Sequence, residues 1–147
     1  MNISGIEKNI RFSIESRFEH VGFIGISVKS LSAYIGFDEI GASEVELAVV
    51  EAVNNAIEHA YQEKPGFTVD VELSVSKDRL VIAVCDTGRT LVKMPEPMKD
   101  PNTLSLNELP ESGMGVFIIR SIMDDLSYET INGRNRFIMT KMLPNSL

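Results

Sequence analysis

Hydrophobic and polar residues follow two different periods along the chain, and each change of period predicts a new element. Apolar residues alternate with polar ones over residues 9–18, which is the pattern of a strand with one buried face. Over residues 23–37 they recur every three or four positions, as on one face of a helix, and Gly36 can end this helix in a left-handed conformation. The chain is therefore predicted to begin with a strand and a helix.

A second helix is predicted from the stretch ELAVVEAVNNAIEHAYQ, residues 46–62, whose apolar residues also recur every three or four positions. Ser43 and Glu46 have the spacing of a capping box, in which each side chain binds a free backbone amide of the other residue. We expect this helix to begin at Ser43 and to end near Tyr61.

Two strands should follow as an antiparallel hairpin. Residues 67–75 alternate cleanly, and residues 79–86 form a continuous apolar run that is typical of a strand buried on both faces. Residues 89–112 then lose all periodicity and contain Pro95, Pro97, Pro101 and Pro110. A loop of this length inside a small domain is usually functional, and we interpret it as a lid.

The last part of the chain is predicted as a helix over residues 113–126 and a hairpin over residues 126–143, which turns at Asn132-Gly133. Strands in antiparallel runs with helices between them favour an α+β fold. We therefore expect one domain over residues 1–147, a two-layer sandwich in which helices lie on one face of a mainly antiparallel sheet.

Composition limits the classes of function. The 147 residues are 44% hydrophobic and 24% charged, which is enough to close one core. A net charge of -7 argues against binding to nucleic acid phosphates and favours a basic protein partner. The single cysteine, Cys85, excludes an internal disulfide, and no apolar run reaches the ~20 residues of a membrane span. We expect a cytoplasmic protein without a signal peptide or a membrane partner.

Polar residues in the second helix are not explained by folding. Asn54 and Asn55 are poor helix formers and together cost about 1 kcal/mol relative to alanine. Glu51 and Asn55 lie four residues apart, on a face separate from the apolar one. Taken alone, this pair is most simply a solvated polar face.

Two further motifs have both a structural and a functional interpretation. Asp86-Thr87-Gly88 follows a buried strand, where it can start a turn or can accept a hydrogen bond from the amino group of a ligand base. Ser112-Gly113-Met114-Gly115 begins the third helix, where glycines punctuate loops but can also bring free amides up to a phosphate. Its spacing is neither that of a Walker A loop nor that of a Rossmann fingerprint.

In combination, Glu-x-x-x-Asn on a helix, Asp-x-Gly after a strand and Gly-x-Gly after a lid resemble the nucleotide site of the GHKL superfamily, which has the Bergerat type of ATPase fold. The stretches SEVELAVVEAVNNAIEHAY, LVIAVCDTG and SGMGVFIIRSIMDDL are most similar to bacterial anti-sigma factors that are also serine protein kinases. The resemblance covers nearly the whole chain.

The resemblance implies a role for each motif. Asn55 would be the Mg²⁺ ligand, Glu51 the general base, and Asp86 with Gly88 the adenine-reading pair. The nucleotide phosphates would lie against the start of the third helix, at Ser112, Gly113, Met114, Gly115 and Val116. ATP and Mg²⁺ are the implied cofactors. The implied partners are a sigma factor, an anti-anti-sigma antagonist with a STAS domain, and a second copy in a homodimer. We interpret His59 as a structural histidine.

The chain also departs from the family. Thr90 stands where many members have the last glycine of Asp-x-Gly-x-Gly, and Arg134 and Asn135 stand where relatives often have threonines. Gly25 replaces a partner-contacting arginine of the sporulation-type members. Two functions therefore stay open at this point: a kinase that phosphorylates its antagonist on serine, and a non-catalytic ATP-binding module that holds a sigma factor. A histidine kinase catalytic domain is disfavoured, because the surroundings of His20 do not resemble a phospho-acceptor helix.

Overall fold

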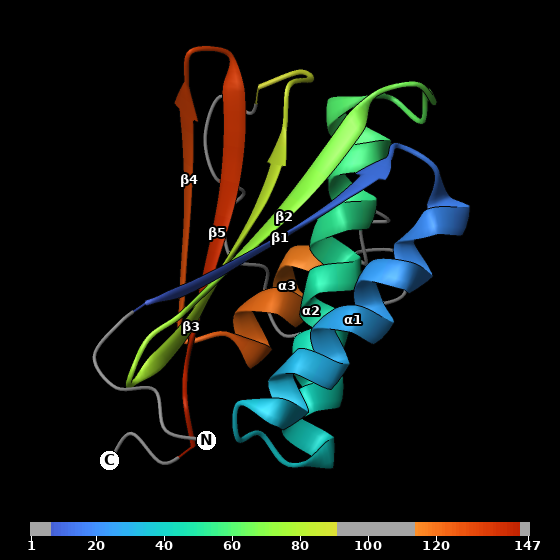
Figure 1. The fold of residues 1–147 in the computed structure, drawn as a ribbon. Helices are drawn as coiled ribbons and strands as arrows, with labels where there is room; N and C mark the ends of the chain where they lie inside the picture. The colour runs from blue at the N-terminus through green and yellow to red at the C-terminus, as the bar shows by residue number, and fades with distance from the viewer. Residues whose placement is uncertain (1–6, 91–113, 145–147) are drawn as a thin grey trace, which may run out of the picture.

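One antiparallel sheet forms the first layer of the protein in a computed structural model that describes residues 7–90 and 114–144 (Figure 1). Its strand order is β1-β2-β3-β5-β4, and every neighbouring pair is antiparallel. The strands are β1 (Lys8–Glu15), β2 (Thr68–Val75), β3 (Arg79–Asp86), β4 (Asp125–Ile131) and β5 (Arg134–Met142). Both predicted hairpins, β2–β3 and β4–β5, are confirmed.

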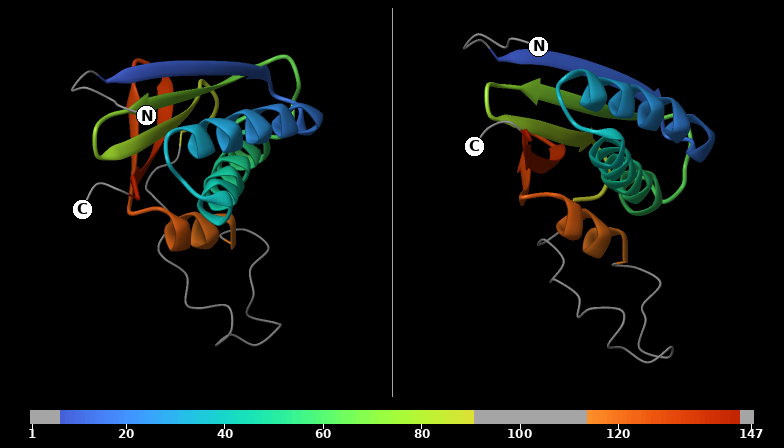
Figure 2. Two further views of the ribbon diagram at one scale, coloured as in Figure 1. Left: turned by 60° about the horizontal axis from the view of Figure 1, so that its bottom comes forward. Right: turned by 90° about the horizontal axis from the view of Figure 1, so that it is seen from below.

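Helices cover one face of this sheet, as Figure 2 shows. They are η1 (Phe18–His20), α1 (Val21–Tyr34), α2 (Glu39–Asn55), the π-helical turn η2 (Ala56–Ala60) and α3 (Met114–Ile122). The predicted two-layer α+β sandwich is confirmed. No helix in the described part of the chain is long and apolar enough to span a bilayer.

The core lies between the two layers because the alternating strands and the apolar helix faces meet there. Val69, Val71 and Leu73 of β2 are at most 1% exposed, and Val45 and Val49 of α2 are fully buried against the same cluster. Burying such a side chain contributes roughly 1.5–3 kcal/mol. The packing of α2 on the sheet therefore fixes where the polar face of that helix can point.

The predicted start of the second helix is wrong. Asp38 is the N-cap of α2, and its side chain accepts a hydrogen bond from the backbone amide of Gly41 at 2.7 Å. Ser43 lies more than one turn inside the helix, so it caps nothing. A carboxylate is as good a cap as a hydroxyl, and helix formation then extends upstream until it reaches Asp38.

Other boundaries also move. The first strand ends at Glu15 rather than at residue 18, because the chain turns into η1. The third helix ends at Ile122 rather than at residue 126, because Asp125 already begins β4. Gly36 has a φ of +125°, which confirms its predicted positive-φ conformation. Apart from Arg89 and Thr90, the predicted lid at residues 89–112 lies outside the described residues.

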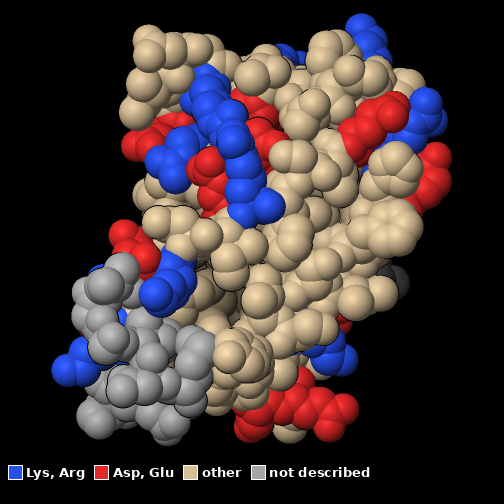
Figure 3. Space-filling model, viewed as in Figure 1, with Lys and Arg blue, Asp and Glu red and all other residues tan. Residues whose placement is uncertain are grey.

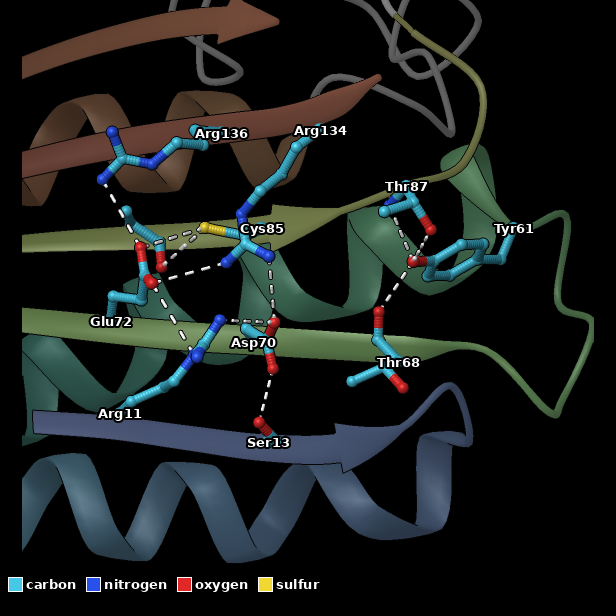
Figure 4. A network of polar contacts seen from close by, with 11 residues as sticks. Arg11, Ser13, Tyr61, Thr68, Asp70, Glu72, Cys85, Thr87, Arg134 and Arg136 are labelled. Atoms are coloured by element: carbon cyan, nitrogen blue, oxygen red, sulfur yellow. Dashed lines mark hydrogen bonds and ion pairs between the residues drawn. The ribbon is translucent and has the colours of Figure 1, made fainter. Parts of the chain in front are cut away.

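The sheet face opposite the helices carries an ion-pair network (Figure 4). Arg134 lies 3.3 Å from Asp70 and 3.4 Å from Glu72, and Arg136 lies 3.5 Å from Glu72. Beneath these side chains Cys85 is 1% exposed, which is why β3 is buried on both faces as predicted. In Figure 3 the charged side chains gather over the strands, whereas the surface over α1 is mostly uncharged.

Candidate functional site

The two polar residues predicted on the second helix lie beside the start of α3. A Cβ atom built on Gly115 would lie 2.9 Å from Oε2 of Glu51 and 3.4 Å from Nδ2 of Asn55. A side chain at position 115 would therefore collide with the Glu51 carboxylate. The structure thus brings the predicted base, the predicted metal ligand and one predicted phosphate-binding glycine together, although they come from distant parts of the sequence.

A π-helical turn follows Asn55 directly. Over Ala56–Ala60 the helix widens, and the amide of Tyr61 donates to the carbonyl of Ala56 at 3.1 Å. Such turns are rare and occur frequently at functional sites. The polar residues Glu51 and Asn55 of α2 are therefore followed directly, along the same helix, by the π-helical turn.

The end of this turn holds the loop that follows β3. The amide of Arg89 donates to the carbonyl of Ala60 at 2.9 Å. A Cβ on Gly88 would lie closer to that carbonyl oxygen than real Cβ atoms come, and 2.9 Å from the ring of Tyr61. Glycine at position 88 is therefore required by this packing, which is a reason for it that does not depend on a nucleotide.

Tyr61 makes the second connection and was not predicted as part of the site. Its hydroxyl donates to the carbonyl of Thr68 at 2.7 Å and accepts from the amide of Thr87 at 2.8 Å (Figure 4). The ring is 4% exposed and stacks on Phe67 at 4.8 Å between centroids. A tyrosine at the end of an apolar helix gives no sequence signal for this role, because its two shortest hydrogen bonds are to backbone groups. The hydroxyl also lies 3.3 Å from the hydroxyl of Thr87.

Asp86 occupies the end of β3, with its side chain turned toward the helix layer. The residue is 9% exposed, and its Oδ1 atom accepts from the amide of Gly88 at 3.0 Å and from Nδ2 of Asn135 at 2.8 Å. Burial raises the pKa of Asp86, whereas these two hydrogen bonds lower it. The carboxylate is therefore held in a polar contact inside a largely apolar surrounding.

Asn135 is the second site residue whose role was not predicted. It is the cross-strand partner of Asp86 in the β3–β5 pair and is fully buried. It also accepts from the hydroxyl of Thr90 at 2.9 Å. Asn135 and Thr90 are two of the positions at which the chain departs from the family that it resembles, and the structure shows that they contact each other. The contact between Asn135 and Asp86 depends on the register in which β3 pairs with β5. The hydrophobic periodicity of a single strand does not predict that register.

For the remaining predicted residues, the structure gives less evidence about a role in the site. Ser112 and Gly113 lie outside the described residues, and Met114 begins α3. The side chain of Val116 is buried, so its backbone amide is the group that could face a ligand. The side chain of His59 is 40% exposed and lies 3.9 Å from Glu58, so it is not a core histidine.

The arrangement fits a nucleotide with a magnesium ion. The Glu51 carboxylate and the Asn55 amide lie beside Gly115, and Mg²⁺ prefers oxygen ligands such as the Asn55 Oδ1 atom. Within residues 7–90 and 114–144, no cluster of three or more His, Cys, Asp or Glu could hold a metal. Asn55 would hold such an ion, which would neutralise charge on the nucleotide phosphates.

Several known proteins are similar to this chain. The family profile described as "Histidine kinase-like ATPase domain" matches residues 14–141. The chain is 28% identical over 138 residues to the serine-protein kinase RsbW of Bacillus subtilis, and the match covers 91% of this chain and 85% of that protein. It is 30% identical over 139 residues to the anti-sigma F factor of Clostridium perfringens, covering 94% of this chain and 99% of that protein.

One solved structure has the same fold. It is a crystal structure of the RsbU and RsbW domains of a Mycobacterium tuberculosis protein, with a TM-score of 0.64 and 14% sequence identity. The match covers 92% of this chain and 32% of that longer chain. At this level of identity the likeness concerns the fold alone.

Proposed function

The chain belongs to the histidine kinase-like ATPase domain family, and from this premise we propose that it is an anti-sigma factor and an ATP-dependent serine protein kinase. It would bind a sigma factor and phosphorylate an anti-anti-sigma antagonist on serine. The observation that carries this proposal is the contact between the start of α3 and the Glu51–Asn55 pair of α2.

Nucleotide binding would use both ends of the site. Asp86 would accept a hydrogen bond from the amino group of adenine. Amides at the start of α3, beginning at Met114, would face the phosphates, where the helix dipole favours negative charge. Burial of Asp86 strengthens its hydrogen bond, because water competes less for a carboxylate that is 9% exposed.

Phosphoryl transfer consists mostly of positioning and charge neutralisation. Asn55 would hold Mg²⁺, which neutralises charge that develops on the phosphates. Glu51, one helical turn away, would accept the proton of the attacking serine hydroxyl. The packing of α2 on α3 supports this role, because Oε2 of Glu51 lies 2.9 Å from the position of a Cβ atom built on Gly115, at the start of the helix that would face the phosphates.

The names of the relatives described above support a sigma factor as a partner, and the other partners are part of the proposal. The sigma factor and an antagonist with a STAS domain are proposed as protein partners, and a homodimer as the working form. The net charge of -7 favours basic surfaces on these partners and disfavours direct contact with nucleic acid. We propose that the protein acts in the cytoplasm.

The test uses the purified chain with labelled ATP and Mg²⁺, a candidate antagonist and its sigma factor. We expect calorimetric binding of ATP, transfer of label to a serine of the antagonist, and co-elution with the sigma factor. A chain that holds the sigma factor but phosphorylates no antagonist would be a non-catalytic binding module instead. A chain that binds no ATP would contradict both versions.

A further inference from the structure

The side chain of Asn135 has every hydrogen-bonding position filled. Its Nδ2 group donates to Asp86 Oδ1 at 2.8 Å and to the carbonyl of Gly88 at 3.1 Å. Its Oδ1 atom accepts from the hydroxyls of Thr90 at 2.9 Å and Thr130 at 2.8 Å. A carboxamide has two donor hydrogens and two acceptor lone pairs, so all four are used. Because the Gly88 carbonyl can only accept, the amide is fixed in this one orientation.

This arrangement makes the two oxygens of Asp86 unequal. Oδ1 receives both hydrogen bonds, from Asn135 and from the amide of Gly88. In residues 7–90 and 114–144, Oδ2 receives none. A ligand amino group would therefore meet Oδ2, and the plane of the carboxylate is set by the bonds to Oδ1.

We propose that Asn135 is a positioning residue that sets the specificity of the nucleotide site, by binding Asp86 Oδ1 so that Oδ2 is presented as a pure acceptor to an amino-bearing purine. This inference rests on the proposed nucleotide site. Asn135 is fully buried and acts through Asp86 without touching the nucleotide. Thr90 supports Asn135 in turn, because its hydroxyl donates to the Asn135 side chain, which donates to the Asp86 carboxylate.

Asn135 also affects the charge of Asp86. Burial raises the pKa of this carboxyl, and the hydrogen bond from Asn135 lowers it. Titratable or charged groups on the adjoining elements include Glu51 on α2, Glu58 and His59 on η2, Arg89 after β3 and Arg120 on α3, while Arg134 and Arg136 of β5 pair with Glu72 on the opposite face of the sheet. Loss of the Asn135 donor would let Asp86 take up a proton at a higher pH. A protonated Asp86 can donate, so it would accept a purine with an oxo group in place of the amino group.

The experiment compares ATP with inosine triphosphate, which carries that oxo group, by calorimetry with Mg²⁺ between pH 5.5 and 8.5. For Asn135→Ala we expect about 10-fold weaker ATP binding at neutral pH, the value of one hydrogen bond to a charged group. We also expect a smaller ratio of ATP to inosine triphosphate affinity, and a loss of ATP binding that begins at a higher pH. Arg134→Ala changes the neighbouring residue on the open face of β5, and it should leave all three readouts at wild-type values.

A folded Asn135→Ala protein with unchanged affinity, ratio and pH profile would overturn the inference. So would a fall in affinity alone, because a purely structural role would change neither the ratio nor the pH profile. If Asn135→Ala does not fold, Thr90→Val decides: it removes one hydroxyl donor and should shift the ratio and the pH profile in the same direction by about 2-fold, and no shift would overturn the inference. Failure of the wild-type protein to bind ATP would instead refute the proposed function.

Discussion

Two polar clusters lie on opposite faces of the sheet. One joins β3 to β5 on the helix side, and the other joins β2 to β5 on the open side, where Arg136 directly follows Asn135 in the sequence. On the helix side, Asp86 and Asn135 are at most 9% exposed and joined by a 2.8 Å hydrogen bond. On the open side, the side chains of Glu72 and Arg136 are about one third exposed and lie 3.5 Å apart. The open side has more formal charge, yet each of its pairs remains in contact with water.

The comparison indicates that burial, more than formal charge, determines how much a polar contact contributes to the free energy of folding or binding. A buried donor or acceptor that loses its partner costs about 1–3 kcal/mol, whereas an exposed ion pair contributes about 0–1 kcal/mol. All proposed site residues lie on the helix side of the sheet. We therefore expect substitutions on that side to change function strongly, and substitutions on the open side to change little.

The largest expected effect on the helix side is that of Glu51→Ala on phosphoryl transfer. Loss of a general base should lower the rate by on the order of 10² to 10⁴. ATP affinity and sigma-factor binding should stay near wild-type values, because neither depends on the base. The measurement is transfer of labelled phosphate to an antagonist serine in a single turnover, with Asn55→Ala as the contrasting variant, which should weaken Mg²⁺-ATP binding itself. A wild-type transfer rate in Glu51→Ala would remove this carboxylate from the mechanism.

The next largest effect should be on folding, in Gly88→Ala. The added methyl group would collide with the carbonyl of Ala60, a backbone atom that cannot move aside cheaply. Overpacking of this kind costs about 1–3 kcal/mol, which urea unfolding can measure. Gly22→Ala is the matched control, since a Cβ there meets no atom within 4 Å. Equal unfolding midpoints for the two variants would show that the loop after β3 is not packed against η2.

Asp86→Asn should separate binding from stability. The amide would present a donor to the adenine amino group in one orientation, or lose a bond to Asn135 in the other, so ATP affinity should fall by about 1–3 kcal/mol, roughly 5- to 150-fold. The free energy of unfolding at neutral pH should not fall by a comparable amount, because the substitution also removes a charge that burial disfavours. Calorimetry and urea unfolding on one preparation test both parts. Parallel losses of both would contradict this account.

The raised pKa of Asp86 also predicts a pH dependence. The folded protein keeps this carboxyl protonated to a higher pH than the unfolded chain does. The resulting stability is complete below the unfolded pKa and is lost as the pH rises through the folded pKa. Relative to wild type, Asp86→Asn should therefore gain stability as the pH rises through that window. ATP affinity of the wild type should move the opposite way and improve over the same window, as Asp86 becomes a pure acceptor.

The smallest effect is expected on the open face, from Glu72→Gln. Glu72 lies near three arginines, at 3.7 Å from Arg11, 3.4 Å from Arg134 and 3.5 Å from Arg136. Its side chain is 34% exposed, so loss of its charge should cost about 0–1 kcal/mol, and less at high salt. ATP affinity should not change. A loss as large as that of Gly88→Ala would mean that the two faces are not as different as their burial implies.

The sequence was sufficient for most of the fold, because period and turn chemistry are local. The β2–β3 and β4–β5 hairpins and the positive φ of Gly36 were predicted from a few adjacent residues each. The start of α2 was mispredicted because two capping signals compete, and Asp38 lies farther upstream than Ser43. The local sequence pattern does not show which of the two possible N-cap residues begins the helix.

Site residues that belong to a sequence motif could be predicted. Site residues that are brought together only by the pairing of strands could not. Glu51, Asn55 and Asp86 belong to motifs, and their assigned roles stay predictions. Tyr61 binds Thr68 and Thr87, 7 and 26 positions away, and only the pairing of β3 with β5 brings Asn135 to Asp86, 49 positions away. No short stretch of the sequence predicts the pairing of β3 with β5.

The same separation has a consequence in time. Asp86 and Asn135 are 49 positions apart. At roughly 5–20 residues per second of synthesis, the ribosome adds Asn135 roughly 2–10 s after Asp86. During that interval the nascent chain already carries Glu51, Asn55 and Asp86 but has no β5 to hold the carboxylate in place. If Asn135 positions Asp86 as proposed, the nascent chain would select ATP fully only after β5 has been made and has paired with β3.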